Sequence, residues 1–245
     1  MRAPHARAGK FGCRMDGKRF KPHHISLIIG VAFALITIAS GIASPGQMIR
    51  YRVTATDSRG DTSREPLFPD PAESPEYAGT IVLNAAIDTQ LPLLHWFVQN
   101  ASAADTRAGT RGSVFFDGEF YDNVYVRVRG VGSSTYPKPS HKFEFNDGHW
   151  FRYADDQPRV DEFNLDSTYG DASYLREHLA HTVYDAIGSY SCITFPMRTH
   201  RNGAFYGVDT FIEQIDETYL ERHGMDADGA LYKMYNSLSD PVIKS

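Results

Sequence analysis

Apolar and polar residues alternate along much of the segment from Ser113 to Phe145, and this two-residue period is the strongest constraint on the fold. Side chains of a β-strand point alternately to opposite faces, so the alternation predicts strands with one buried face. The stretches "SVFF", "DG" and "EFYDNVYVRVRG" predict a hairpin with a long second strand, and "HKFEF" predicts a strand after the next loop. In the first of these strands Val124, Val126 and Val128 share one face and Tyr125, Arg127 and Arg129 the other. In the second, His141, Phe143 and Phe145 lie opposite Lys142 and Glu144.

A segment further along the chain has the period of a helix instead. In "DASYLREHLAHTVYDAIG", Asp171 can cap the first turn and Gly188 can end the helix. The stretches "FPMRTH", "RNG" and "FYGVDTFIEQI" predict a second hairpin, whereas "LPLLHWFVQNA" and "DETYLERHG" predict short helices. The expected fold is therefore α+β, a mostly antiparallel sheet covered by one main helix. The apolar stripe of that helix comprises Leu175, Leu179, Val183 and Ile187.

A basic N-terminus precedes an uncharged apolar run. Residues 1–24 carry seven Lys and Arg residues, and "ISLIIGVAFALITIASGIA" follows them. About 19 apolar residues can just cross a bilayer as a helix, with the cationic flank in the cytoplasm. A cleaved signal peptide is the alternative, because "ASGIAS" offers small residues near a cleavage point. The domain that follows would then be extracytoplasmic and anchored to the membrane, or secreted.

These features divide the chain into four parts. We expect a basic cytoplasmic N-terminus at 1–24, a transmembrane helix or signal peptide at 25–43, a flexible linker at 44–79 and a folded domain at 80–245. The linker is rich in Pro, Ser, Arg and Asp, which resist regular structure. The formal charge of −5 and the lack of a basic stripe beyond residue 24 argue against a nucleic-acid-binding protein. Cys13 and Cys192 form no disulfide framework or zinc spacing.

The loop between the two strand segments, "GVGSSTYPKPS", collects groups that bind phosphate. Gly130 and Gly132 permit turns whose N–H groups form anion-binding nests. A glycine-rich turn between two strands, followed by a lysine, is also the layout of protein-kinase nucleotide loops. The alternative is an ordinary hairpin turn with solvated lysines. The hydroxyl and ammonium donors of the loop and the following strand are Ser133, Ser134, Thr135, Lys138 and Lys142.

Two glutamates could belong to the same site. Glu177, near the start of the main helix, could pair with a lysine on a neighbouring strand, as a helix glutamate does in kinases, or it could be a surface residue. Glu213 interrupts an apolar strand, and since a buried carboxylate is costly without a partner, we expect it in a cleft. The acidic residues between positions 155 and 171 could attract a hard cation or lie in solvated loops. His178 and His181 could share a metal-binding helix face or be a solvated pair, and no metal ligand is assigned.

Together these segments resemble the CotH kinase family, which is named for a spore-coat protein and regarded as a group of atypical protein kinases. The family's loop runs roughly Arg-Gly-x-Ser-Ser, an aromatic residue and Pro-Lys-Lys-Ser. The resemblance continues in "FNLDSTYGDASYLREHLAHTVYDAIG", "RNGAFYGVDTFIEQIDETYLERHG" and "DGALYK", so that it covers roughly residues 80 to 235. The residues that match in the loop are Arg129, Gly130, Ser133, Tyr136, Pro137, Lys138 and Ser140.

The resemblance implies the small lobe of an atypical kinase-like fold, with ATP and Mg²⁺ as cofactors and protein Ser/Thr hydroxyls as acceptors. Pro139 and His141 depart from the family pattern, which reduces the charge expected to face the phosphates. The family's Asn-Tyr-Asp and Trp-Asp-x-Asp segments are expected beyond Ser245, so no catalytic residue is assigned and the chain should be inactive alone. The competing hypothesis is a non-catalytic cell-surface module that binds protein or glycan. The residues expected to bind nucleotide are Arg129, Gly130, Gly132, Ser133, Ser134, Lys138, Lys142, Glu177 and Glu213.

Overall fold

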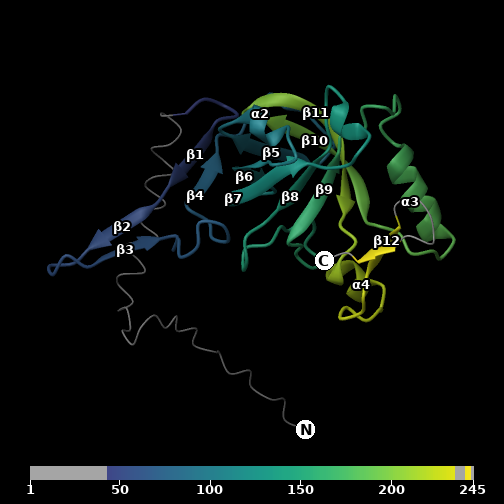
Figure 1. The fold of residues 1–245 in the computed structure, drawn as a ribbon. Coiled ribbons are helices and arrows are strands. Elements are labelled where there is room, and N and C mark those ends of the chain that lie inside the picture. The colour runs from purple at the N-terminus through teal and green to yellow at the C-terminus, as the bar shows by residue number, and fades with distance from the viewer. Residues whose placement is uncertain (1–42, 235–240, 244–245) are drawn as a thin grey trace, which may run out of the picture. The chain divides into compact units, whose positions relative to one another are not determined.

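The centre of the molecule is a closed seven-stranded β-barrel (Figure 1). The computed structural model describes residues 43–234 and 241–243. Around the barrel the strands follow the order β5-β6-β7-β8-β9-β11-β10, and all neighbours are antiparallel except β10 and β5, whose parallel pairing closes the barrel. The barrel strands are β5 (Leu93–Val98), β6 (Thr110–Phe116), β7 (Glu119–Val128), β8 (His141–Glu144), β9 (Glu162–Asp166), β10 (Thr194–Arg201) and β11 (Ala204–Glu213).

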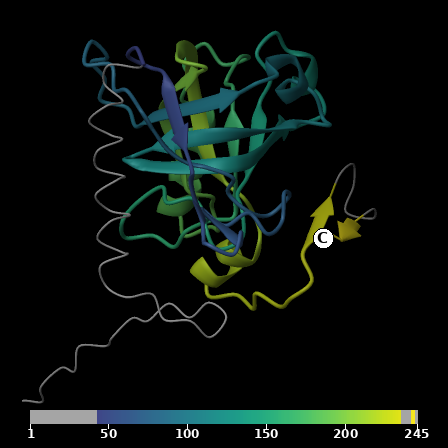
Figure 2. The same cartoon turned by 90° about the vertical axis from the view of Figure 1, so that its left-hand side faces the viewer.

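Aromatic rings fill the barrel. Phe163 packs against Phe143, Phe151 and Phe211, with ring centroids 4.7 to 5.1 Å apart. These four side chains are fully buried, and Phe143, Phe163 and Phe211 lie at inward-facing positions of β8, β9 and β11. Since aromatic side chains bury the largest areas, this interior supplies the main hydrophobic stabilisation of the fold. Figure 2 shows the barrel turned by 90°, with the purple strand β1 in front of it.

Both predicted hairpins are present. The turn between β6 and β7 places Asp117 and Gly118 at φ values of 45° and 82°, as the two central residues of a tight hairpin turn require. Asn202 and Gly203 do the same between β10 and β11, with φ values of 52° and 83°. The predicted alternation is also confirmed, since one face of each strand is buried, with these side chains: Val124, Val126, Val128, His141, Phe143 and Phe145.

The predicted α+β arrangement, a sheet covered by one main helix, is wrong. The sheet closes on itself, so its apolar face is covered by the facing strands and needs no helix. Helix α3 (Arg176–Ala186) forms within the predicted segment, and the amides of Leu175 and Arg176 donate to the Asp171 carboxylate at 3.1 and 2.9 Å. No residue of α3 is buried, however, and the predicted stripe is exposed to solvent. The helix lies beside the barrel (Figure 1).

The helix expected at "LPLLHWFVQNA" is also wrong, because this segment forms strand β5. Leu94, Trp96 and Val98 point into the core, while His95 and Phe97 on the other face are buried as well. A strand that is apolar on both faces shows no alternation, and this explains why its period was not visible. Strand β9, with the sequence "EFNLD", was not predicted as a separate element.

Residues 44–79 are not the structureless linker that their composition predicts. They include β1 (Met48–Tyr51), which pairs with β4 (Ala78–Ile81), and β2 (Val53–Thr56), which pairs with β3 (Thr62–Glu65). Asp122 of β7 fixes this region to the barrel, because its Oδ2 accepts the amide of Tyr77 at 2.8 Å. The alternation in "RYRVTAT" and the turn at Gly60 were the signals that the proline-rich composition concealed.

The N-terminal predictions fall almost entirely outside the described residues. The basic segment 1–24 and the membrane-spanning or signal segment 25–43 lie there, apart from Ala43. Within residues 43–234 and 241–243, no helix combines the length and apolar character needed to span a bilayer. The remaining elements are α2 (Ala101–Ala104), the 3₁₀-helix η1 (Ser133–Thr135), α4 (Glu217–Arg222), β12 (Tyr232–Met234) and β13 (Pro241–Ile243).

Candidate functional site

The predicted phosphate loop connects β7 to β8 at one end of the barrel. Gly130 has a φ of +80°, and a Cβ atom at this position would lie 2.5 Å from the Ser133 Oγ, so glycine is required here. Gly132 has a φ of −70° and open space around it, so it has no such requirement. Ser133 and Ser134 lie in η1, and the Ser134 hydroxyl donates to the Val131 carbonyl at 2.7 Å. The Thr135 hydroxyl likewise donates to the Gly132 carbonyl at 3.2 Å, so the loop is a defined turn that uses two of the predicted hydroxyl donors internally.

Lys138 turns back from the loop toward a buried carboxylate. Its Nζ lies 2.7 Å from the Oδ1 of Asp209, whose side chain is 2% exposed. The same ammonium group donates to the carbonyls of Val208 and Ser167, at 3.1 and 3.4 Å. Three acceptors match the three N–H groups of a lysine. Lys138 therefore anchors the loop to β11 in this structure.

Lys138 and Thr199 stabilise the buried carboxylate of Asp209. Burial raises the pKa of its carboxyl group, while the charge and hydrogen bond of Lys138 and the hydrogen bond of Thr199 act in the opposite direction. Thr199 donates its hydroxyl to the other carboxylate oxygen, Oδ2. Asp209 was not among the predicted site residues, although it resembles Glu213 in being a carboxylate on the inward face of an otherwise apolar strand.

Arg129 and Glu177 lie close enough for their charges to interact. Arg129 is largely buried, and its Nη1 has no hydrogen-bond partner within the described part of the chain. Burial lowers the pKa of Arg129, whereas the negative charges of Asp166 and Glu177 raise it. Burial and the charge of Asp166 raise the pKa of Glu177, and Arg129 opposes this rise. Asp166, at the end of β9, is therefore a third member that sequence analysis did not assign to the site.

Lys142 and Glu213 are not at the loop. Lys142 points outward from β8 and pairs with Glu162 of β9. Glu213 is buried, as its apolar strand suggested, but its partner is Arg222 of α4, whose Nε donates at 2.9 Å. It also accepts the amide of Ile193 at 2.9 Å. Both residues stabilise the packing of neighbouring elements.

The possible metal ligands have structural partners instead. The Nδ1 of His178 lies 3.1 Å from the Thr194 Oγ1, and the Nδ1 of His181 accepts the Cys192 amide at 3.1 Å. Asp171 caps the start of α3. Over the ranges that the structure describes, no group of three or more His, Cys, Asp and Glu side chains could hold a metal ion.

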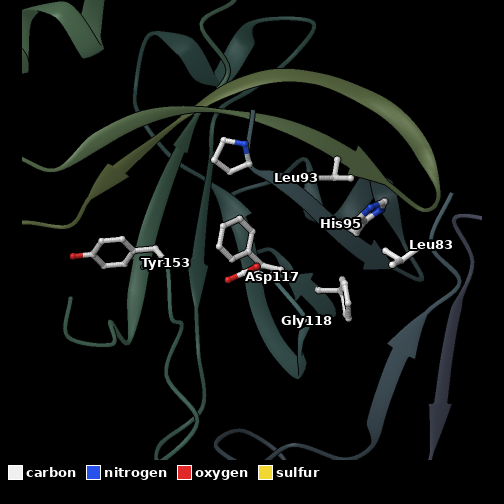
Figure 3. A pocket seen from close by; sticks show the side chains of 9 residues that line it. Leu83, Leu93, His95, Asp117, Gly118 and Tyr153 are labelled. Atoms are coloured by element: carbon white, nitrogen blue, oxygen red, sulfur yellow. The ribbon is translucent and has the colours of Figure 1, made fainter. Parts of the chain in front are cut away.

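A pocket of about 510 Å³ opens elsewhere, near the start of β5 and the β6–β7 turn (Figure 3). Its wall is mostly apolar, with His95 and Asp117 among the polar contributors. None of the residues predicted to bind nucleotide lines it. This pocket is therefore separate from the loop site. The lining comprises Leu83, Pro92, Leu93, His95, Phe115, Phe116, Asp117, Gly118 and Tyr153.

Comparison with known proteins connects the loop site to a family. The family model described as CotH kinase protein matches residues 126–244. The match includes the loop, Asp166, α3 and Asp209, and thus every residue of the site described above. No curated protein matches the chain. Residues 126–244, slightly less than half of the chain, are thus similar to the CotH kinase family.

Proposed function

We propose that the loop at Gly130 binds the phosphates of ATP as part of an atypical protein kinase acting on Ser/Thr hydroxyls. The observation that carries this proposal is Arg129, a largely buried arginine whose Nη1 lacks an acceptor directly beside the loop. A buried donor without a partner costs about 1–3 kcal/mol, and more when it is charged. A phosphate oxygen would satisfy it with a charge-assisted hydrogen bond. The family's description as a kinase protein supports the same ligand.

Mg²⁺ is compatible with the residues present. This ion keeps several waters and is usually held by one or two carboxylates together with phosphate oxygens. Asp166 and Glu177 are two carboxylates whose charges act on one another and on Arg129. They are therefore the residues that would hold Mg²⁺ when it accompanies ATP. The ion would supply positive charge to the phosphates.

Titration with ATP and Mg²⁺ tests the proposal. A ligand that binds the folded state raises the melting temperature in a concentration-dependent way, so we expect ATP–Mg²⁺ to stabilise the full chain in thermal unfolding. Arg129→Lys keeps the charge but loses the planar fork that matches phosphate. We expect roughly tenfold weaker binding, as for the loss of one hydrogen bond to a charged group.

Arg127→Lys is the matched control, because Arg127 lies two residues earlier, near the end of β7, and pairs with Glu144 on the outer face. It should bind ATP–Mg²⁺ like the wild type. The proposal is contradicted when the wild type shows no stabilisation by ATP–Mg²⁺. It is equally contradicted when Arg129→Lys and Arg127→Lys bind with the same affinity as the wild type.

A non-catalytic module that binds another protein is the second candidate function. Helix α3 favours it, because Leu179, Val183 and Ile187 are 54%, 57% and 72% exposed. Exposed apolar patches on folded proteins often mark interaction sites. Such a module would bind its partner equally well before and after Arg129→Lys, whereas a nucleotide-dependent kinase would respond to that change. Under both functions we propose an extracytoplasmic location, with residues 25–43 either anchoring the chain to the membrane or being removed on secretion.

A further inference from the structure

We propose that Arg107, in the turn between α2 and β6, is a second phosphate-binding residue of the loop site. This inference rests on the proposed nucleotide function and adds a phosphate-binding residue that lies outside the loop sequence. Arg107 is exposed, and its Nη2 donates to the carbonyl oxygen of Gly130. The guanidinium group therefore sits at the glycine where the loop begins.

The turn that carries Arg107 is held firmly against the end of β7. The amide of Val128 donates to the Thr106 carbonyl at 2.9 Å, and the Tyr125 hydroxyl donates to the Ala108 carbonyl at 2.5 Å. A Cβ atom at Gly109 would lie 2.5 Å from the Val126 carbonyl oxygen, so the two backbones are in direct contact. The backbone at Arg107 is therefore fixed by the turn beside the loop.

Charge distinguishes Arg107, like Arg129, from the other cations on the loop and on the strands beside it. Lys138 pairs with Asp209, Lys142 with Glu162, and Arg201 with Asp105 at 2.8 Å. Arg107 has no carboxylate partner among the residues with described positions. An incoming phosphate would have to break an existing ion pair to engage the other three. At Arg107 it meets an uncompensated positive charge.

The donor geometry of arginine suits this role. A guanidinium group has five N–H donors in a planar fork, and the contact with Gly130 uses one nitrogen. The remaining donors can bind two phosphate oxygens at once. Because the Gly130 carbonyl already positions the group, little side-chain freedom is lost on binding. Arg107 thus supplies the exposed positive charge that Lys138 and Lys142 were expected to supply.

Binding of ATP–Mg²⁺ and of pyrophosphate to the full chain tests this inference. We expect Arg107→Ala to weaken both ligands by roughly tenfold or more. Arg107→Gln separates the charge from the hydrogen-bonding capacity, because glutamine keeps an amide donor but carries no charge. It should bind as weakly as Arg107→Ala, and affinity should fall less steeply with salt than in the wild type. Arg59→Ala, an exposed arginine in the β2–β3 turn, is the matched control and should have no effect.

Each outcome decides between the hypotheses. When Arg107→Gln binds like the wild type, the arginine only supports the loop and the inference is overturned. When Arg129→Lys weakens binding but Arg107→Ala does not, the proposed function stands and the inference fails. When the wild type binds neither ATP–Mg²⁺ nor pyrophosphate, both are overturned. Unchanged melting temperatures of the unliganded variants show that the losses are not caused by misfolding.

Discussion

Asp209 shows how a single buried carboxylate can hold a surface loop in place. Its side chain is 2% exposed, and an isolated charge at such a position would be strongly unfavourable. Lys138 and Thr199 compensate it with an ion pair and a hydrogen bond. Gly207 makes this approach possible, because a Cβ atom there would lie 2.3 Å from the Lys138 Nζ. The lysine that the resemblance assigned to phosphate is therefore first of all a residue that attaches the loop to the barrel.

Removing the lysine should destabilise the whole protein. Lys138→Met leaves the buried Asp209 without its cation, and breaking one half of a buried ion pair costs about 3–5 kcal/mol. Since Lys138 is 18% exposed, we expect the lower end of that range in the free energy of unfolding measured with urea. The double variant Lys138→Met/Asp209→Asn should recover part of the loss, because it removes the unpaired charge. A change below about 0.5 kcal/mol in the single variant would show that the pair is solvated.

At the scale of secondary structure elements, α3 differs most from its expected role. Its sequence has the spacing of an amphipathic helix, yet none of its residues is buried. It is held at its edges by Asp171, which caps it, and by His178 and His181, which contact Thr194 and Cys192. A helix of 11 residues is marginal in water without tertiary packing. These polar contacts therefore supply much of its attachment to the barrel.

The apolar stripe of α3 should contribute little to folding stability. Leu179→Gln replaces a side chain that is 54% exposed, and we expect a change within about 0.5 kcal/mol in urea unfolding. Leu165→Ala, at a buried position on β9, is the comparison and should cost about 2–5 kcal/mol. A loss above about 1 kcal/mol for Leu179→Gln would contradict the exposed position of the stripe.

At the scale of the whole molecule, the decisive feature is the parallel seam between β5 and β10. The pairing of Arg198 with Leu93 through Arg201 with Trp96 converts an antiparallel sheet into a closed barrel. On its outer face, His95 lies directly opposite His200, with ring centroids 5.1 Å apart. Burial and then the neighbouring His200 lower the pKa of His95 to about 4. Burial and Arg198 lower the pKa of His200 as well.

This seam should make the barrel sensitive to acid. The unfolded state binds a proton at His95 near pH 6.5, whereas the folded state does so only near pH 4. Stability is therefore fully present above pH 6.5 and falls as the pH decreases toward 4, by on the order of 2 kcal/mol. Replacing the imidazole in His95→Phe should flatten this part of the curve of unfolding free energy against pH. Parallel curves for the wild type and the variant would refute a role for His95.

Several features could be predicted from local sequence. The two hairpins and α4 depend on turn residues and caps that act within a few positions, such as Gly118, Gly203 and Asp216. The family could also be recognised in this way, because its residues follow one another in order along the chain. Loop residues Arg129 and Gly130 were assigned on the same grounds, and their role in binding nucleotide remains a prediction.

The features that were predicted wrongly or missed depend on contacts between segments far apart in the sequence. Strand β5 looks like a helix in sequence because both of its faces are covered, one by the core and one by neighbouring chain. The ion pair of Lys138 with Asp209 likewise depends on where the loop meets β11, which lies far from it in the sequence. The sequence by itself determined the local turns, the alternation of buried residues and the family. Only the tertiary structure decided that the sheet closes, because closure depends on pairing β5 with β10 across about a hundred residues of chain, which no local pattern encodes.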